Sequence, residues 1–108
     1  MMTPEEGYFS QIGGARTNVG NISAPYAELS VYRSALRLSC FGQDYAFAKE
    51  TIVALTRYRG LFSIGLRIHH SVPLYPSLMV FWVSTAFRRS RYTKLKERLE
   101  AFGYEVED

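Results

Sequence analysis

The sequence has little of what most recognisable enzyme and membrane-protein classes require. Its 108 residues include one cysteine, Cys40, which cannot form a disulfide within the chain. The most apolar stretch, LMVFWV at residues 78–83, is far shorter than the roughly 18–20 residues of a membrane-spanning helix. The opening MMTPEEGYFS has no basic start followed by an apolar run, as a secretion signal would. These absences predict a cytoplasmic protein that is not integral to a membrane.

Motifs that bind nucleotides or carry catalysis are also missing. The sequence contains no phosphate-binding G-x-x-x-x-G-K-[ST], no G-x-S-x-G, no G-x-G-x-x-G and no cysteine pair at zinc spacing. We therefore expect a non-enzymatic protein without a cofactor or a metal. An enzyme of an unfamiliar kind is the third alternative, behind the two binding functions given below.

Composition indicates one packed domain over residues 1–108. Hydrophobic residues make up 47% of the chain and aromatic residues 15%, which is enough for a core. Thirteen basic residues against ten acidic ones give a net charge of +3. This positive charge is well below that expected of a dedicated nucleic-acid-binding protein. We expect a flexible N-terminal segment over residues 1–14, a β-rich body over 15–84 and a C-terminal helix over 87–103.

A period of two dominates the body. Apolar residues alternate with polar ones in AELSVY (27–32) and ALRLSCF (35–41), which predicts two half-buried strands joined by a hairpin. In ETIVALTRY (50–58) the β-branched residues favour a strand over a helix. The stretch GGARTNVGNISAP (13–25) is rich in glycine and asparagine, and within it residues 16–23 could form a weak first strand or an ordered loop.

The stretch RYRGLFSIGLRIHH (57–70) predicts a turn near Gly60 and then a strand. Alternation leaves Arg67 and His69 on its polar face, and it puts on the apolar face Phe62, Ile64, Leu66, Ile68 and His70. The following LMVFWV predicts a strand buried on both faces. Trp82 within it is expected in the core, although an aromatic side chain near an edge could also line a ligand pocket.

The last element is predicted to be an amphipathic helix that covers the sheet. In RYTKLKERLEAF (91–102) one apolar stripe contains Tyr92, Leu95, Leu99 and Phe102. Gly103 suits the end of a helix. The chain is therefore predicted to be mainly β, a barrel or sandwich of six or seven antiparallel strands capped by one C-terminal helix.

This order of elements, with AELSVYRSALRLSCFG leading into YAFAKETIVALTRY and a closing helix, resembles the PH-like superfold, including bacterial PH-like and GRAM-type domains. The resemblance covers about residues 15–103 and rests on pattern. It implies a bent barrel whose open end is plugged by the helix and which binds lipid headgroups, peptides or proteins. Phosphoinositide-binding members cluster lysines and arginines in the first hairpin, whereas GGARTNVGNISAPY (13–26) carries Arg16 alone, so no functional residue is carried over.

The two histidines and the cysteine are poor candidates for chemistry. His69 and His70 are adjacent on a strand and so project to opposite faces, which prevents them from chelating one ion. We expect a structural His70 and a solvated His69. Cys40 lies on the apolar side of its strand, which suits an inert buried thiol.

The densest basic feature is FRRSRYTKLK (87–96), at the predicted helix start. It is expected to be either a solvated helix entry or a docking patch for an anion, since helix N-termini favour anions. The candidate binding residues are Arg88, Arg89, Arg91 and Lys94, with Arg57, Arg59, Arg67 and His69 if the fold gathers them. Because basic residues are dense at the helix start and Arg16 is isolated, we expect anions to bind at the helix start rather than at Arg16.

Two functions follow from these features. The first is a small binding or scaffolding domain that acts through a protein partner or through self-association. The second is an anion binder that recognises nucleic acid or an acidic membrane surface through the basic helix start. If ligand binding weakens steeply as salt is added, the second function is favoured, because contacts to phosphate depend strongly on ionic strength.

Overall fold

The computed structural model describes residues 8–85 and 89–108. These residues form eight strands, one α-helix and one short 3-10 helix. The elements are β1 (Phe9–Thr17), β2 (Gly20–Val31), β3 (Ala35–Cys40), β4 (Gln43–Ala48), η1 (Lys49–Thr51), β5 (Ile52–Arg59), β6 (Ser63–His70), β7 (Met79–Thr85), α1 (Arg89–Ala101) and β8 (Val106–Glu107).

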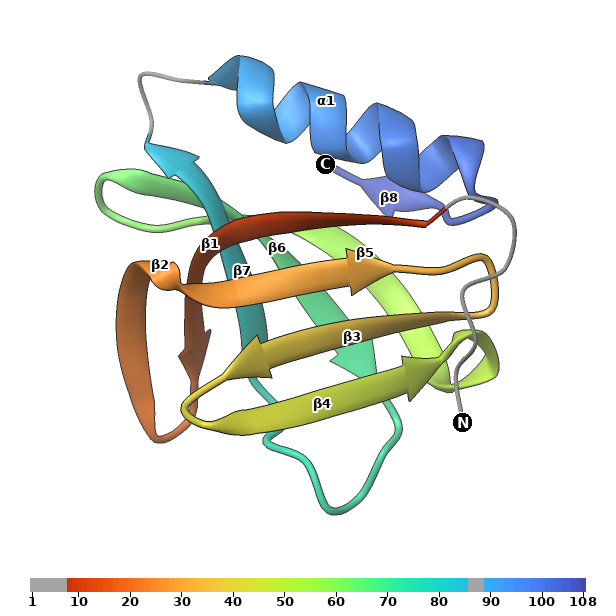
Figure 1. The fold of residues 1–108 in the computed structure, drawn as a ribbon, viewed down its shortest axis with the longest axis horizontal. Helices are drawn as coiled ribbons and strands as arrows, with labels where there is room; N and C mark the ends of the chain where they lie inside the picture. Colours follow the sequence, from red (N-terminus) through yellow and green to blue (C-terminus); the bar gives the residue numbers. More distant parts are fainter. Residues whose placement is uncertain (1–7, 86–88) are drawn as a thin grey trace.

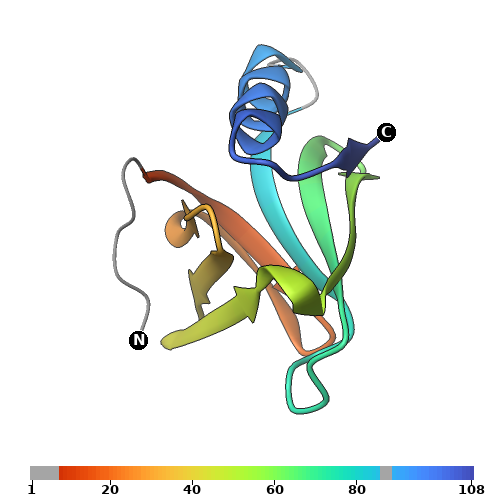
Figure 2. The same cartoon turned by 90° about the vertical axis from the view of Figure 1, so that its right-hand side faces the viewer.

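The strands make one curled sheet, a half-barrel, in the order β4-β3-β2-β1-β7-β6-β5-β8. Figures 1 and 2 show two splayed arms of this sheet, with α1 lying across one end. The predicted mainly-β class with a C-terminal helix is confirmed. The sheet has more strands than the six or seven expected, and β8 pairs with β5 in parallel where only antiparallel pairs were expected. Strand β8 has only two residues, too few to show the alternation from which a strand is predicted.

Strand β1 joins the two arms, because it pairs with β2 on one side and with β7 on the other. The register between β1 and β2 shifts between Gly13 and Ala15. A Cβ added at Gly13 would lie 2.2 Å from the carbonyl oxygen of Trp82, and one at Gly14 would lie 2.5 Å from that of Ile22. Only glycine therefore allows the backbones to approach this closely at the bend.

The body begins earlier than expected. We predicted it to start at residue 15, yet Phe9 already pairs with Val31 at the start of β1. Phe9 is buried, and its ring meets that of Phe102 edge-on, with 5.4 Å between the centroids. Residues 9–14 therefore belong to the sheet, and the open alternative for residues 16–23 resolves into two strands with a turn at Asn18–Val19.

The predicted alternation describes the core well. All the residues of β2 and β3 that the period of two placed inward are buried: Ala27, Leu29, Val31, Leu36, Leu38 and Cys40. Ala35, at the start of β3, is buried as well. In β6 the residues Ile64, Leu66 and Ile68 are buried as expected. Phe62 is the exception, because it precedes β6 in the turn and is 69% exposed.

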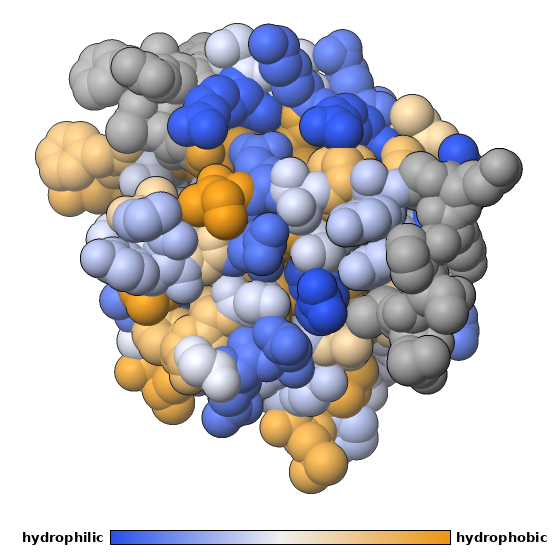
Figure 3. All heavy atoms as spheres, viewed as in Figure 1, coloured by the Kyte–Doolittle hydropathy of each residue, from blue (hydrophilic) through white to orange (hydrophobic). Residues whose placement is uncertain are grey.

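Helix α1 packs on the sheet through the predicted stripe, in which Tyr92, Leu95 and Leu99 are buried. Gly103 has a φ of +89°, and the N–H of Tyr104 donates to the Leu99 carbonyl at 3.0 Å, so the helix ends in the predicted glycine motif. Figure 3 shows hydrophilic side chains over the outward side of α1. Within the described residues, no helix has the length and apolar character needed to cross a membrane.

We predict that Leu99→Ala lowers the free energy of unfolding by about 2–5 kcal/mol, the range for a fully buried leucine. Chemical denaturation measures this loss. Lys94→Ala, an exposed change on the same helix, serves as the control and should cost less than about 0.5 kcal/mol. A loss below about 1 kcal/mol for Leu99→Ala would contradict this packing of α1.

Candidate functional site

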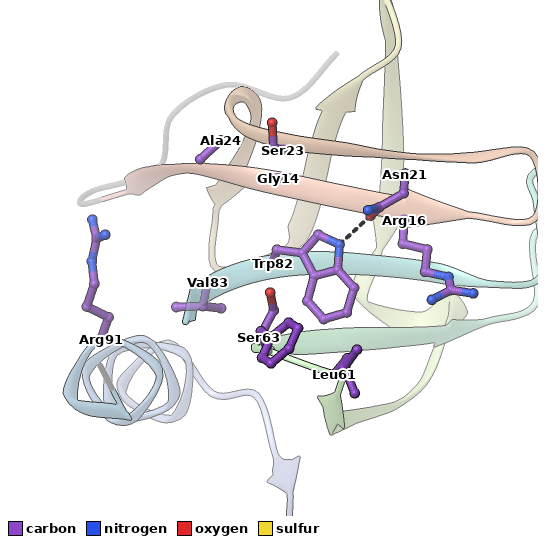
Figure 4. A pocket seen from close by; sticks show the side chains of 12 residues that line it. Gly14, Arg16, Asn21, Ser23, Ala24, Leu61, Ser63, Trp82, Val83 and Arg91 are labelled. Atoms are coloured by element: carbon purple, nitrogen blue, oxygen red, sulfur yellow. Dashed lines mark hydrogen bonds between the residues drawn. The ribbon is translucent and has the colours of Figure 1, made fainter. Parts of the chain in front are cut away.

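A hollow with a volume of about 750 Å³ lies where β1, β2, the β5–β6 turn, β7 and α1 meet. We call it the Trp82 pocket. Its lining residues are Gly14, Arg16, Asn21, Ser23, Ala24, Gly60, Leu61, Phe62, Ser63, Trp82, Val83 and Arg91. Figure 4 shows the indole of Trp82 in its centre, with Arg16 to one side and Arg91, on α1, to the other.

The indole of Trp82 is held in place from several directions. Its Nε1–H donates to Oδ1 of Asn21 at 2.6 Å, and its ring lies 5.6 Å from that of Tyr58, centroid to centroid. A Cβ at Gly65 would lie 2.9 Å from the indole, and one at Gly60 would lie 2.7 Å from it. The ring therefore occupies space left free by two glycines. A fixed aromatic surface of this kind binds ligands without first losing conformational freedom.

The rim of the Trp82 pocket is apolar at the β5–β6 turn. Leu61 is 88% exposed and Phe62 69% exposed, and both line the pocket. Hydrophobic side chains stand out in Figure 3 at the edge where this turn projects in Figure 1. Neighbouring exposed apolar side chains beside a hollow are typical of an interaction site.

The structure places one residue of the predicted basic patch in this pocket, Arg91. Arg88 lies outside the described residues, and Arg89 is the first residue of α1. Lys94 is exposed but does not line the pocket. Among the described side chains of the helix start, Arg91 is the one that lines the pocket.

The remaining basic candidates lie on two opposite sides of the sheet. Arg57 pairs across β5 and β6 with the buried Leu66, so it is on the core-facing side, and Arg59 shares that side. Arg67 follows Leu66 and therefore points the other way, with His69 on its side. The structure does not bring these four residues into one patch with the helix start.

Both histidines are held by hydrogen bonds. Nδ1 of His70 accepts from the N–H of Val72 at 3.1 Å, so Nε2 carries the proton and donates to the Pro76 carbonyl at 2.8 Å. This is the structural role expected for His70. His69 is half-buried rather than solvated, with Nε2 2.9 Å from Oγ1 of Thr56. Burial, and then the charge of Arg67, lower the pKa of His69.

Cys40 is buried in the core, and burial raises the pKa of its thiol to about 11. The thiolate, which is the reactive form, is therefore scarce at neutral pH. Over residues 8–85 and 89–108, no group of three or more histidine, cysteine, aspartate or glutamate side chains is placed to hold a metal ion.

Sequence reasoning missed three features of the Trp82 pocket. Arg16 was set aside because it is isolated in the sequence, Phe62 was assigned inward, and Leu61 was not singled out. The signal for Trp82 was present, since Phe81 and Val83 are buried on the core side and the residue between them must point away. The continuous apolar character of LMVFWV hides this alternation.

Compared with known protein families and with curated proteins, the sequence matches none. The function is therefore inferred from the geometry of the Trp82 pocket.

We predict that Gly60→Ala displaces the indole and lowers stability by about 1–3 kcal/mol, the usual cost of overpacking. Trp82 is the single tryptophan of the chain, so its emission spectrum reports the displacement directly. Gly20→Ala is the matched control, because its added Cβ would make only ordinary contacts at 3.7 Å. If Gly60→Ala costs as much in a Trp82→Phe background as in the wild type, the indole is not the clashing group.

We also predict that Cys40 resists thiol-specific reagents at pH 8 in the native protein and reacts fully in denaturant. The unfolded thiol, with a pKa near 9.0, loses its proton before the native thiol, whose pKa is about 11. Stability should therefore fall as the pH rises through this window. Denaturation of the wild type and of Cys40→Ala across it isolates this contribution, which the variant should lack. Fast labelling of the native protein would contradict burial of the thiol.

Proposed function

We propose that this protein is a non-enzymatic binding domain of the cytoplasm, and that it holds a segment of a partner protein in the Trp82 pocket. The observation that carries the proposal is the pocket itself: a concave site of about 750 Å³ with a fixed indole on its floor. This volume lies within the range of about 300–1,000 Å³ that is usual for ligand sites.

The rim supports a peptide or protein as the ligand. Leu61 and Phe62 expose large apolar side chains next to the floor, and Trp82 adds an aromatic group with a polar edge. Aromatic and aliphatic anchors around a hollow are what protein interfaces use for most of their binding energy.

The chemistry of the described residues also favours binding over catalysis. The side chains best suited to nucleophilic or acid-base work, Cys40, His69 and His70, do not line the pocket. Each of them is buried or held by structural hydrogen bonds. The half-barrel with its C-terminal helix is in keeping with the PH-like resemblance, and that superfold is used mainly for binding.

A random peptide library selected against the full chain tests this proposal. We expect selected peptides to bind the wild type and to lose about tenfold or more in affinity for the double variant Leu61→Ser/Phe62→Ser, whose exposed positions leave folding intact. The matched control is Val19→Ser/Leu74→Ser, which removes two highly exposed apolar side chains elsewhere and should bind like the wild type.

Two results would overturn the proposal. The first is a selection that yields no peptide, or one whose peptides bind Leu61→Ser/Phe62→Ser with the same affinity as the wild type. The second is a dimer, seen by sedimentation, that Leu61→Ser/Phe62→Ser dissociates, because a second copy of the chain would then be the occupant of the pocket.

A further inference from the structure

The charged side chains that line the Trp82 pocket have one sign. Arg16 comes from β1 and Arg91 from α1, and over residues 8–85 and 89–108 no acidic side chain lines the pocket. Figure 4 shows the two side chains on opposite sides of the indole. A ligand that extends across Trp82 would therefore meet a guanidinium group at each end.

These two arginines are available to a ligand. Both are exposed, and neither forms an ion pair with any acidic residue of the described chain. Three other cations, by contrast, are engaged: Lys49 donates to the Phe102 carbonyl, Arg98 lies over the ring of Phe9, and Lys96 pairs with Asp108. Arginine is well suited to carboxylates, because its planar group donates two parallel hydrogen bonds.

Between the two arginines lies the indole of Trp82, an apolar surface whose polar edge is already bonded to Asn21. The hydroxyl-bearing Ser23 and Ser63 also line the pocket. A ligand must therefore present an apolar side chain at its centre and negative charge toward its ends. An anionic group placed on the indole itself would lose hydration against a surface that offers it no free hydrogen-bond donor.

We infer that the segment held in the Trp82 pocket is acidic: an apolar side chain packs on Trp82 while flanking carboxylates bind Arg16 and Arg91. This inference rests on the proposed function and names the chemistry of the partner. It gives Arg16 a role that its isolation in the sequence did not suggest.

A peptide fits these observations better than an anionic membrane. A lipid bilayer presents its charged headgroups first and its apolar chains behind them, so headgroups would lie against the apolar floor. A peptide side chain can enter the hollow while carboxylates on its neighbours reach outward to both sides. Binding of anionic vesicles in place of a peptide would overturn the inference.

Titration of the full chain, followed by Trp82 fluorescence, tests the inference. The probes are a short peptide with one leucine flanked by aspartates and the same peptide with asparagines in place of the aspartates. We expect the acidic peptide to bind roughly tenfold more tightly at low salt, since each exposed ion pair contributes modestly. This advantage should shrink as salt is added, because screening acts on the ion pairs and not on apolar contact.

Two charge-matched variants separate pocket contacts from general attraction. Arg16→Gln/Arg91→Gln should bind both peptides equally and weakly. Arg57→Gln/Lys94→Gln removes the same charge from exposed positions that do not line the pocket, and it should keep the preference for the acidic peptide. Equal losses in the two variants would mean that net charge alone attracts the peptide, which overturns the inference.

The remaining outcomes are also decisive. If the asparagine peptide binds as tightly as the acidic one, the acidic partner is wrong while binding of a protein segment stands. If neither peptide binds, the inference fails. If vesicles of phosphatidylcholine with phosphatidylserine bind through Arg16 and Arg91 and no peptide does, both the inference and the proposed function are overturned.

Discussion

The close approach of three backbones at Gly13 and Gly14 is the constraint on which the rest of the structure depends. From this point β1 pairs with β7 along its second edge while it continues, after the register shift, to pair with β2, so one strand belongs to both arms of the sheet. A side chain at either position would collide with a neighbouring carbonyl oxygen. Without the bend the arms could not curl around one core, and α1 would have no open end to cover.

The bend also creates the Trp82 pocket. Gly14 pairs with Trp82 and contributes no side chain, which leaves the indole uncovered on the side away from the core. Gly65 and Gly60 then give the ring room to lie against the β5–β6 turn. The glycines required for close strand packing thus leave an aromatic surface open, and the arginines of β1 and α1 lie beside it.

The sequence predicted the parts of the fold that follow a simple period. Alternation in β2, β3 and β6 and the stripe of α1 identified most core residues, because burial on one face imposes that pattern. Strand β1 was only partly recognised, since its glycines lower strand preference even though its pairing is extensive. The parallel pairing of β8 with β5 depends on where α1 ends in the tertiary structure, and no local sequence pattern indicates it.

The pocket was harder to predict because basic residues that are close together in the sequence need not be close together in the structure. Alternation on β5 and β6 sends Arg57 and Arg67 to opposite sides of the sheet, although the stretch that contains them looks uniformly basic. Arg16 and Arg91 are far apart in sequence and come together only because β1 pairs with β7 and α1 follows β7 directly. A binding site assembled at a bend therefore draws its residues from isolated positions, which sequence clustering cannot rank.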